Sequence, residues 1–258
     1  MFDAIGIRMK ENYENISKTK LTRRTPVVIR IDGKAFHTFT KNFQKPFDFI
    51  LMESMKETTL RLCKNIQNAK LGYCQSDEIS ILLCDYDNLD TAAWFDNEVQ
   101  KICSISASMA TFYFNQIFDR KVEEFSDALH LAWNVSEIEQ KYEETLWRAV
   151  EKGAMFDSRC FNIPKEEVTN YFLWRQQDAT RNSIQMVGQY YFKHKELQNK
   201  SCNDIQNMLL TKKDINWNDL TIDKKRGTCI IKKEGKWIID NNIPIFKEEG
   251  RDYIDQLI

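Results

Sequence analysis

LGYCQSDEISILL, residues 71–83, reads as two β-strands joined by a short acidic turn. Residues 71–74 and 79–83 are rich in apolar, aromatic and β-branched side chains, as strands with a buried face are. Gln75-Ser76-Asp77-Glu78 supplies the polar residues that turns prefer. We therefore expect a β-hairpin that carries Asp77 and Glu78 at its tip.

A second acidic motif, Arg30-Ile31-Asp32-Gly33, follows another apolar run, Val27-Val28-Ile29. Between the two motifs, Asp48 opens a stretch to about residue 66 in which apolar side chains recur at helical spacing. If both strands belong to one sheet, Asp32 and Asp77 can meet at neighbouring strand ends. Two carboxylates that hold Mg²⁺ are what phosphoryl and nucleotidyl transfer requires. Two acidic turns that only cap strands are the plainer alternative.

The remaining segments complete an α+β pattern. We expect helices over residues 2–20, 94–117, 136–150, 164–194 and 204–210, and strands over 155–163, 228–232 and 236–239. Residues 120–135 give only weak signals. The order strand, helix, hairpin, helix, strand predicts a ferredoxin-like antiparallel sheet with helices packed on one face. That is the topology of polymerase palms and nucleotidyl cyclases. Residues 1–135 would form the palm-like catalytic region, and 136–258 a helical and basic region integrated with it.

Composition narrows the class of protein. The chain has 258 residues, of which 42% are hydrophobic and 29% charged, as in soluble globular proteins. We find no apolar run near the ~20 residues that a membrane span needs, and no signal peptide. Seven cysteines without a Cys-x-x-Cys pair predict reduced thiols in a cytoplasmic protein. Three dispersed histidines argue against a histidine-rich zinc site.

Positive charge is concentrated late in the chain. Residues 193–236 contain 11 Lys and Arg against six Asp and Glu, although the whole chain has a formal net charge of −1. The clusters include Lys193, Lys195, Lys224, Lys225 and Arg226. A solvated polar surface and a track for a phosphate backbone both explain this segment.

Several motifs resemble those of the tRNA-His guanylyltransferase family, the 3′-to-5′ RNA polymerases. The resemblance spans roughly residues 26–230, and the motifs follow one another in the family's order. They are RIDGKAFHTF at 30–39, FQKPFD at 43–48, QSDE at 75–78, FDSR at 156–159, YFLWRQQD at 171–178 and KRGT at 225–228.

One departure from the family matters for substrate choice. Eukaryotic members continue the Trp-Arg-Gln helix, after one residue, with Asp-Cys-His-Ile-Asn-Asn-Leu-Tyr-Asn, whereas this chain continues DATRNSIQM, residues 178–186. The histidine and terminal asparagine implicated in tRNA-His addition are replaced by Thr180 and Met186. The chain is thus similar to the bacterial and archaeal like-protein branch, which repairs truncated tRNA 5′ ends by templated addition. Untemplated addition of guanosine to tRNA-His is the alternative.

The resemblance implies a chemistry and a set of site residues. ATP or GTP would activate the tRNA 5′ phosphate, and the 3′-OH of a nucleoside triphosphate would then attack it. Two Mg²⁺ ions would be held by Asp32, Asp77 and the carbonyl of Gly33, and Glu78 would complete the catalytic carboxylates in a supporting position. A side chain at residue 33 would crowd the nucleotide. The implied nucleotide contacts are Gly33, Lys34, Ala35, Phe36, His37, Lys45, Ser76, Lys101 and Asn182.

Further expectations concern partners and neighbouring residues. The basic residues Lys193, Lys195, Lys224, Lys225 and Arg226 would contact tRNA, and a homotetramer, usual in the family, would pool these segments. We expect Trp174 in the core rather than as a platform for base stacking. A palm-type nucleotide cyclase would share the carboxylate pair but would need no RNA surface. A non-catalytic RNA-binding module would not need Asp32 and Asp77 together with Lys45.

Overall fold

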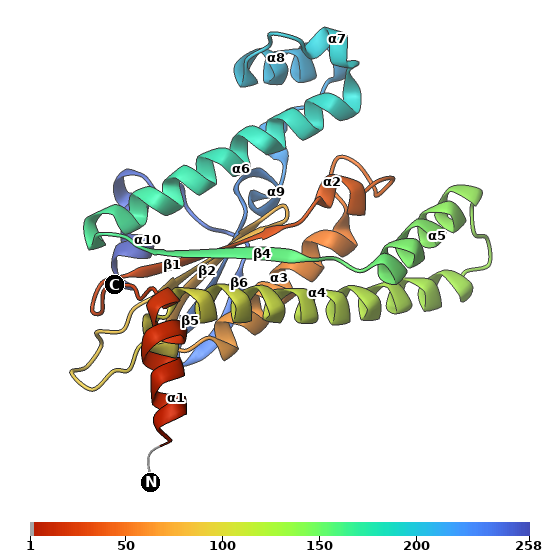
Figure 1. The fold of residues 1–258 in the computed structure, drawn as a ribbon. Helices are drawn as coiled ribbons and strands as arrows, with labels where there is room; N and C mark the ends of the chain where they lie inside the picture. Colours follow the sequence, from red (N-terminus) through yellow and green to blue (C-terminus); the bar gives the residue numbers. More distant parts are fainter. Residues whose placement is uncertain (1–2) are drawn as a thin grey trace.

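A computed structural model describes residues 3–258 and contains one antiparallel sheet of six strands (Figure 1). The strand order is β4-β1-β3-β2-β5-β6. The first four strands have the ferredoxin-like order, and the predicted hairpin is β2 and β3. The strands are β1 Val27–Gly33, β2 Ala69–Gln75, β3 Glu78–Leu83, β4 Phe156–Asn162, β5 Thr228–Lys233 and β6 Lys236–Asp240. The α+β prediction is therefore confirmed.

Helices cover both faces of the sheet, so the prediction of helices on one face is wrong. Helices α3 (Phe49–Asn65) and α4 (Val99–His130) pack on the face that carries Ile29 and Ile81. Helix α6 (Val168–Tyr191) covers the face that carries Val28 and Leu82. Strands β1 and β3 contain consecutive apolar residues, Val27-Val28-Ile29 and Ile81-Leu82-Leu83, instead of an alternation of apolar and polar ones. This pattern is typical of strands with both faces covered, since neither face meets water.

Helix α4 extends 13 residues beyond the predicted end at Ile117. Val122, Ser126 and Leu129 are buried at helical spacing within the charged stretch that gave weak signals. This part of α4 pairs with α5 (Glu137–Lys152), which begins with the predicted capping box of Ser136 and Glu139. The two helices form a hairpin that extends past the sheet (Figure 1).

The shorter elements complete the chain. Residues 4–17 are helical, so the predicted helix over 2–20 ends three residues earlier than expected, and residue 2 lies outside the described residues. Helix α8 (Cys202–Lys213) packs against α6 through a small apolar core that holds it beyond the sheet. The core includes Leu209 of α8, Val187 of α6 and Trp217, which follows α8 in the chain. No helix among residues 3–258 has the length and apolar content to cross a membrane. The remaining helices are α1 Ala4–Met9, α2 Phe36–Phe39, α7 His194–Leu197, α8 Cys202–Lys213, α9 Ile222–Arg226 and α10 Asp252–Asp255.

Candidate active site

Asp32 and Asp77 lie together at one end of the sheet. Asp32 on β1 stands opposite Glu78 on β3, and the backbone N–H of Gly33 donates to the carbonyl oxygen of Asp77 at 3.1 Å. Ser76 occupies the left-handed region with φ +50°, which tightens the turn. Its hydroxyl donates to Oδ1 of Asp77 at 3.0 Å. The predicted meeting of the two strand ends therefore occurs.

The electrostatics of this pair favour a bound cation. Burial raises the pKa of Asp77, its own backbone N–H and the Ser76 hydroxyl oppose that rise, and the charges of Asp32 and Glu78 add to it. None of the salt bridges within residues 3–258 includes Asp32 or Asp77, whereas Asp157, opposite Asp32 on β4, pairs with Arg159 at 2.9 Å. Two adjacent carboxylates without a protein cation gain most from an external one.

The donors suit Mg²⁺ bound together with a substrate. Within residues 3–258, no three His, Cys, Asp or Glu side chains form a metal centre by themselves. Mg²⁺ commonly uses one or two carboxylates and completes its octahedron with water and substrate phosphates. The carboxylates of Asp32 and Asp77, with a nearby backbone carbonyl such as that of Gly33, match this kind of site.

Glu78 lies beside the pair in a different environment. Its carboxylate is buried and accepts from Arg175 Nε at 2.7 Å and Nη2 at 2.9 Å. Arg30 Nη2 lies 2.8 Å from the same carboxylate, and Arg175 also donates to Asp178 at 2.7 Å. Glu78 therefore joins the hairpin to β1 and α6, which fits the supporting position expected for it.

A cleft of about 710 Å³ opens next to Asp77. Backbone and side chains of the 33–48 loop form one wall, and Met186 and Gln189 of α6 form the other. Of the predicted nucleotide contacts, the cleft is lined by Gly33, Ala35, Phe36, His37, Lys45 and Ser76. Lys45 and His37 are exposed and can move toward a bound polyphosphate.

Asp48 and Gly33 determine the conformation of the 33–48 segment that forms one wall of the cleft. Asp48 caps α3 by accepting from Leu51 N–H at 2.9 Å, and its second oxygen accepts from Gln44 N–H at 3.0 Å and the Tyr142 hydroxyl at 2.7 Å. At Gly33 a Cβ atom would lie 2.2 Å from the buried ring of Phe36. Glycine is thus required there by the protein's own packing, a reason that the sequence did not show.

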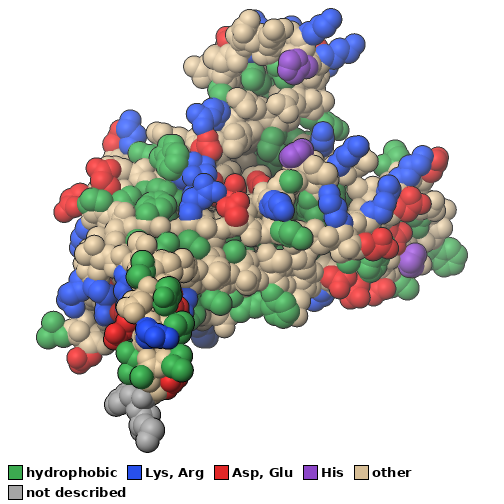
Figure 2. Space-filling model, viewed as in Figure 1, with side chains coloured by type: hydrophobic (Ala, Val, Ile, Leu, Met, Phe, Trp, Pro, Cys, Tyr) green, Lys and Arg blue, Asp and Glu red, His purple; other side chains and the backbone are tan. Residues whose placement is uncertain are grey.

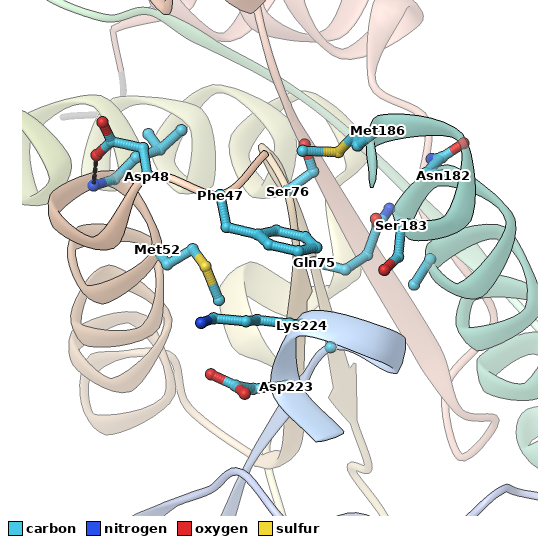
Figure 3. Close-up of a pocket in the computed structure, with 13 residues that line it drawn as sticks. Phe47, Asp48, Met52, Gln75, Ser76, Asn182, Ser183, Met186, Asp223 and Lys224 are labelled. Atoms are coloured by element: carbon cyan, nitrogen blue, oxygen red, sulfur yellow. Dashed lines mark hydrogen bonds between the residues drawn. The ribbon is translucent and has the colours of Figure 1, made fainter. Parts of the chain in front are cut away.

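A smaller cavity of about 90 Å³ adjoins the cleft, and the two share Asp48, Leu51, Ser76 and Met186 (Figure 3). Phe47 lies in its centre between Met186 and Lys224. Asn182, a predicted nucleotide contact, lines this cavity from α6. Phe47 and Met52 also line this cavity, although no sequence motif predicts a site role for them. Phe47 stands at the variable position of the Lys-Pro-x-Asp motif, so only the cavity reveals it.

Two predicted contacts lie elsewhere. Lys101 sits in the first turn of α4, 3.6 Å from Glu98, and does not line the cleft. Five residues further along α4, Ser106 forms a hydrogen bond with Ser158 of β4, and Ser158 stands opposite Ile31. Lys101 therefore lies toward the other end of the sheet. Lys34 is exposed, and its backbone N–H donates to Met155.

The basic residues predicted to contact tRNA divide into two groups. Lys224 lines the small cavity, with Nζ 5.9 Å from the Phe47 ring, and Lys225 donates to the carbonyl of Asn218. The carbonyl of Arg226 accepts from the Tyr73 hydroxyl at 2.7 Å. Lys193 and Lys195 are exposed at α7, in the part of the molecule that stands beyond the sheet, where Figure 2 shows Lys and Arg side chains on the surface.

Trp174 is not in the core, so that prediction is wrong. Its side chain is 50% exposed on α6. The buried residues nearest to it in this helix are Tyr171, Phe172, Arg175 and Gln176, and position 174 lies on the exposed side of the helix.

An antiparallel palm-type sheet with a carboxylate pair beside a cleft is the arrangement expected of a palm-type enzyme that acts on nucleoside triphosphates. The model of the Thg1 family, described as tRNAHis guanylyltransferase, matches residues 7–164. This chain belongs to that family and is a nucleotidyltransferase. A probable tRNA(His) guanylyltransferase of Dictyostelium discoideum is 29% identical over 220 residues, covering 80% of this chain and 75% of that protein.

Solved structures agree with this assignment. A bacterial tRNA(His) guanylyltransferase (Thg1)-like protein in complex with ATP superposes with a TM-score of 0.84 and 47% identity over 99% of both chains. A bacterial like-protein in complex with GTP gives 0.78 and 42%, also over 99% of both chains. The Saccharomyces cerevisiae enzyme gives 0.66 and 23% over 91% of this chain and 97% of that chain, a likeness of fold. The higher identities to bacterial like-proteins support the resemblance to that branch.

Proposed function

We propose that this enzyme repairs truncated tRNA by Mg²⁺-dependent, templated addition of nucleotides to the 5′ end. The observation that carries the proposal is the Asp32–Asp77 pair, which has no salt-bridge partner among residues 3–258 and borders, through Asp77, a cleft lined by Lys45 and Ser76. Similar bacterial proteins bind ATP and GTP, the nucleotides that such a cleft would receive.

The reaction has two steps. The tRNA 5′ phosphate first displaces pyrophosphate from ATP or GTP and becomes joined to a nucleoside monophosphate. The 3′-OH of an incoming nucleoside triphosphate then attacks the tRNA 5′ phosphorus, loses its proton and displaces that monophosphate. A tRNA that already has a 5′ triphosphate would lose pyrophosphate instead.

Each group in the cleft has a task in this scheme. Bound Mg²⁺ ions would lower the pKa of the 3′-OH and neutralise triphosphate charge. Asp32, Asp77 and the Gly33 carbonyl would hold the ions. Lys45 and Ser76 would bind phosphate oxygens, Lys45 as a mobile point charge. Ala35, Phe36 and His37 line the same space.

The smaller cavity bears on how a base is chosen. The Thr180 hydroxyl donates to the carbonyl of Gln176 within α6, and the Met186 side chain that lines both cavities has no N–H or O–H donor. Neither residue can replace the hydrogen bonds of the histidine and asparagine of eukaryotic members. We infer that pairing with a template base selects the incoming nucleotide.

The tRNA body would lie along the basic residues of segment 193–236. Exposed Lys193 and Lys195 stand on α7, away from the carboxylate pair, and suit contacts with the phosphate backbone. A homotetramer would bring several such segments to one tRNA, which would compensate for the net charge of −1 of each chain.

The test uses 5′-labelled tRNA that lacks its first nucleotide, incubated with all four nucleoside triphosphates. Changing the opposing acceptor-stem base from C to A should switch the added nucleotide from G to U. Addition of G to both tRNAs would replace the repair reaction with untemplated guanosine addition. Cyclic nucleotide made without RNA would identify a cyclase.

A further inference from the structure

The exposed ring of Trp174 lies on a surface to which the proposed reaction assigns no role. One face of the ring lies over the Arg175 guanidinium, 4.3 Å from Cζ to the ring centroid, and Arg30 Cζ lies at 5.7 Å. Both guanidiniums are fixed by the buried carboxylate of Glu78. The protein thus holds a half-exposed indole in a set orientation, although its burial contributes little to the core.

An exposed positive charge stands on the same face of the sheet, beside the Arg30 whose guanidinium lies near this ring. Arg159 on β4 stands opposite Arg30 on β1, and its side chain is 53% exposed. Its guanidinium is bound by Asp157 at 2.9 Å, and Asp157 stands opposite Asp32. Arg159 lies two residues from Asp157 on β4 and therefore on the same face of the sheet as the Asp32 side chain. The hydrogen bond with Asp157 contributes most to the raised pKa of Arg159. Figure 2 shows Lys and Arg side chains close to Asp and Glu between α6 and β4.

The carboxylate pair lies between this surface and the nucleotide cleft. Along α6, Trp174 and Arg175 adjoin Glu78, whereas Met186, 12 residues later, lines the cleft. At 1.5 Å per residue the two positions are about 18 Å apart along the helix. A reaction that joins two substrates at one carboxylate pair needs two approaches to it. The nucleotide occupies the approach at Met186, so the approach at Trp174 and Arg159 is free for the RNA.

We propose that Trp174 and Arg159, here called the acceptor strip, bind the 5′ end of the RNA substrate. The 5′-terminal base stacks on the exposed part of the Trp174 ring, and the Arg159 guanidinium binds the 5′ phosphate. Stacking on an aromatic ring accepts every base, as an enzyme that repairs different tRNA ends requires. Arginine suits the phosphate because its fork of donors can contact two oxygens. This inference rests on the proposed function and names the site of its RNA substrate.

The experiment measures binding without catalysis. An RNA hairpin that mimics the acceptor stem carries 2-aminopurine as its 5′-terminal base, with either a 5′ phosphate or a 5′ hydroxyl. Wild-type protein should quench the fluorescence and bind the phosphorylated hairpin more tightly. Trp174→Ala should weaken binding about tenfold and remove most of the quenching, in the range for one stacked base. Trp174→Phe should restore most of both.

Arg159→Ala should remove the preference for the 5′ phosphate while leaving the quenching in place. Trp133→Ala is the matched control, because Trp133 is fully exposed in the loop between α4 and α5, away from the sheet. It should bind like wild type. For nucleotide addition, Trp174→Ala should raise the KM for RNA and leave the KM for the nucleoside triphosphate unchanged.

The acceptor strip would be wrong if wild-type protein did not bind the hairpin, or if Trp174→Ala bound the hairpin as tightly as Trp133→Ala does. It would also be wrong if Trp174→Ala had a sedimentation coefficient different from that of the wild type, because Trp174 would then be a contact between subunits. The proposed function fails separately. If wild-type protein binds and quenches the hairpin but adds no nucleotide to any truncated tRNA, the strip stands and the repair reaction does not.

Discussion

Asp77 and Glu78 are neighbours in the chain, yet their surroundings are opposite. Glu78 is buried against the guanidiniums of Arg30 and Arg175, so the protein itself supplies its counter-charge. Among residues 3–258, Asp77, with Asp32 beside it, has no such partner, and burial raises its pKa. A carboxylate whose charge is matched within the protein stabilises the fold. A carboxylate without a counter-charge in the protein requires an ion or a substrate to neutralise it. Glu78 therefore has a structural role, and Asp77 a role in binding.

The largest effect should follow removal of the unmatched pair. Asp32→Ala and Asp77→Ala should each reduce nucleotide addition to below a tenth of the wild-type rate, because half of the anionic metal ligands are lost. The fold should persist, since neither side chain belongs to a buried ion pair. The measurement is addition to truncated tRNA together with circular dichroism. A well-folded variant that keeps more than a tenth of the activity would contradict the site.

Removal of the matched charge should act on stability. Arg175→Met leaves Glu78 buried with one guanidinium fewer, and breaking such a pair typically costs about 3–5 kcal/mol. Urea unfolding measures this free energy. Arg181→Ala is the control, because Arg181 pairs with Asp178 at an exposed position and its loss should cost about 1 kcal/mol or less.

Glu78→Gln tests whether Glu78 acts by stabilising the structure or by contacting the metal or substrate. If this variant loses stability and activity together, Glu78 acts by holding the hairpin against α6. If it keeps wild-type stability and loses all activity, Glu78 acts directly on the metal or substrate, and the contrast with Asp77 fails.

A smaller effect is expected from the residues that line the cleft. Lys45→Ala and Ser76→Ala should each raise the KM for the nucleoside triphosphate by an amount equivalent to about 1–3 kcal/mol, the scale of a charge-assisted hydrogen bond. Filter binding should show unchanged tRNA affinity. Lys101→Ala provides a comparison: an equal rise in KM would mean that Lys101 reaches a triphosphate bound elsewhere in an assembly of subunits.

Much of the fold could be predicted because its signals are local. The hairpin around Asp77, the Asp48 cap and the Ser136–Glu139 capping box each depend on residues a few positions apart. The end of α4 could not be predicted, since Val122 and Leu129 are buried only because α5 packs beside them. The coverage of both sheet faces likewise depends on segments distant in the sequence.

The candidate site divides in the same way. The motifs identified Asp32, Asp77, Lys45 and Ser76, but the partner of Glu78 lies 97 residues away and has no local signature. The prediction that Trp174 lies in the core rests on the high average burial of tryptophan side chains. Trp174 lies on the opposite side of the helix from the buried Phe172, and this helical phase indicates a position at the surface.

The smallest expected effect concerns the contribution of the Asp77 charge to the stability of the folded protein. A carboxyl group whose pKa is raised by folding favours the folded state at low pH, and that contribution is lost as the pH rises through the raised pKa. Without Mg²⁺ at neutral pH, the ionised Asp77 therefore destabilises the protein. Asp77→Asn removes this charge and retains an oxygen for the Ser76 hydroxyl, so its Tm should exceed that of the wild type.

The difference in Tm should shrink as the pH falls below the raised pKa, because Asp77 of the wild type is then neutral as well. Adding Mg²⁺ at neutral pH should reverse the order. A ligand bound only by the folded state stabilises it, and tenfold tighter binding adds about 1.4 kcal/mol at saturating concentration. The wild type should gain Tm with Mg²⁺ and Asp77→Asn should gain much less. A variant that is less stable than the wild type without Mg²⁺ would mean that a protein group already compensates Asp77, and the contrast with Glu78 would be lost.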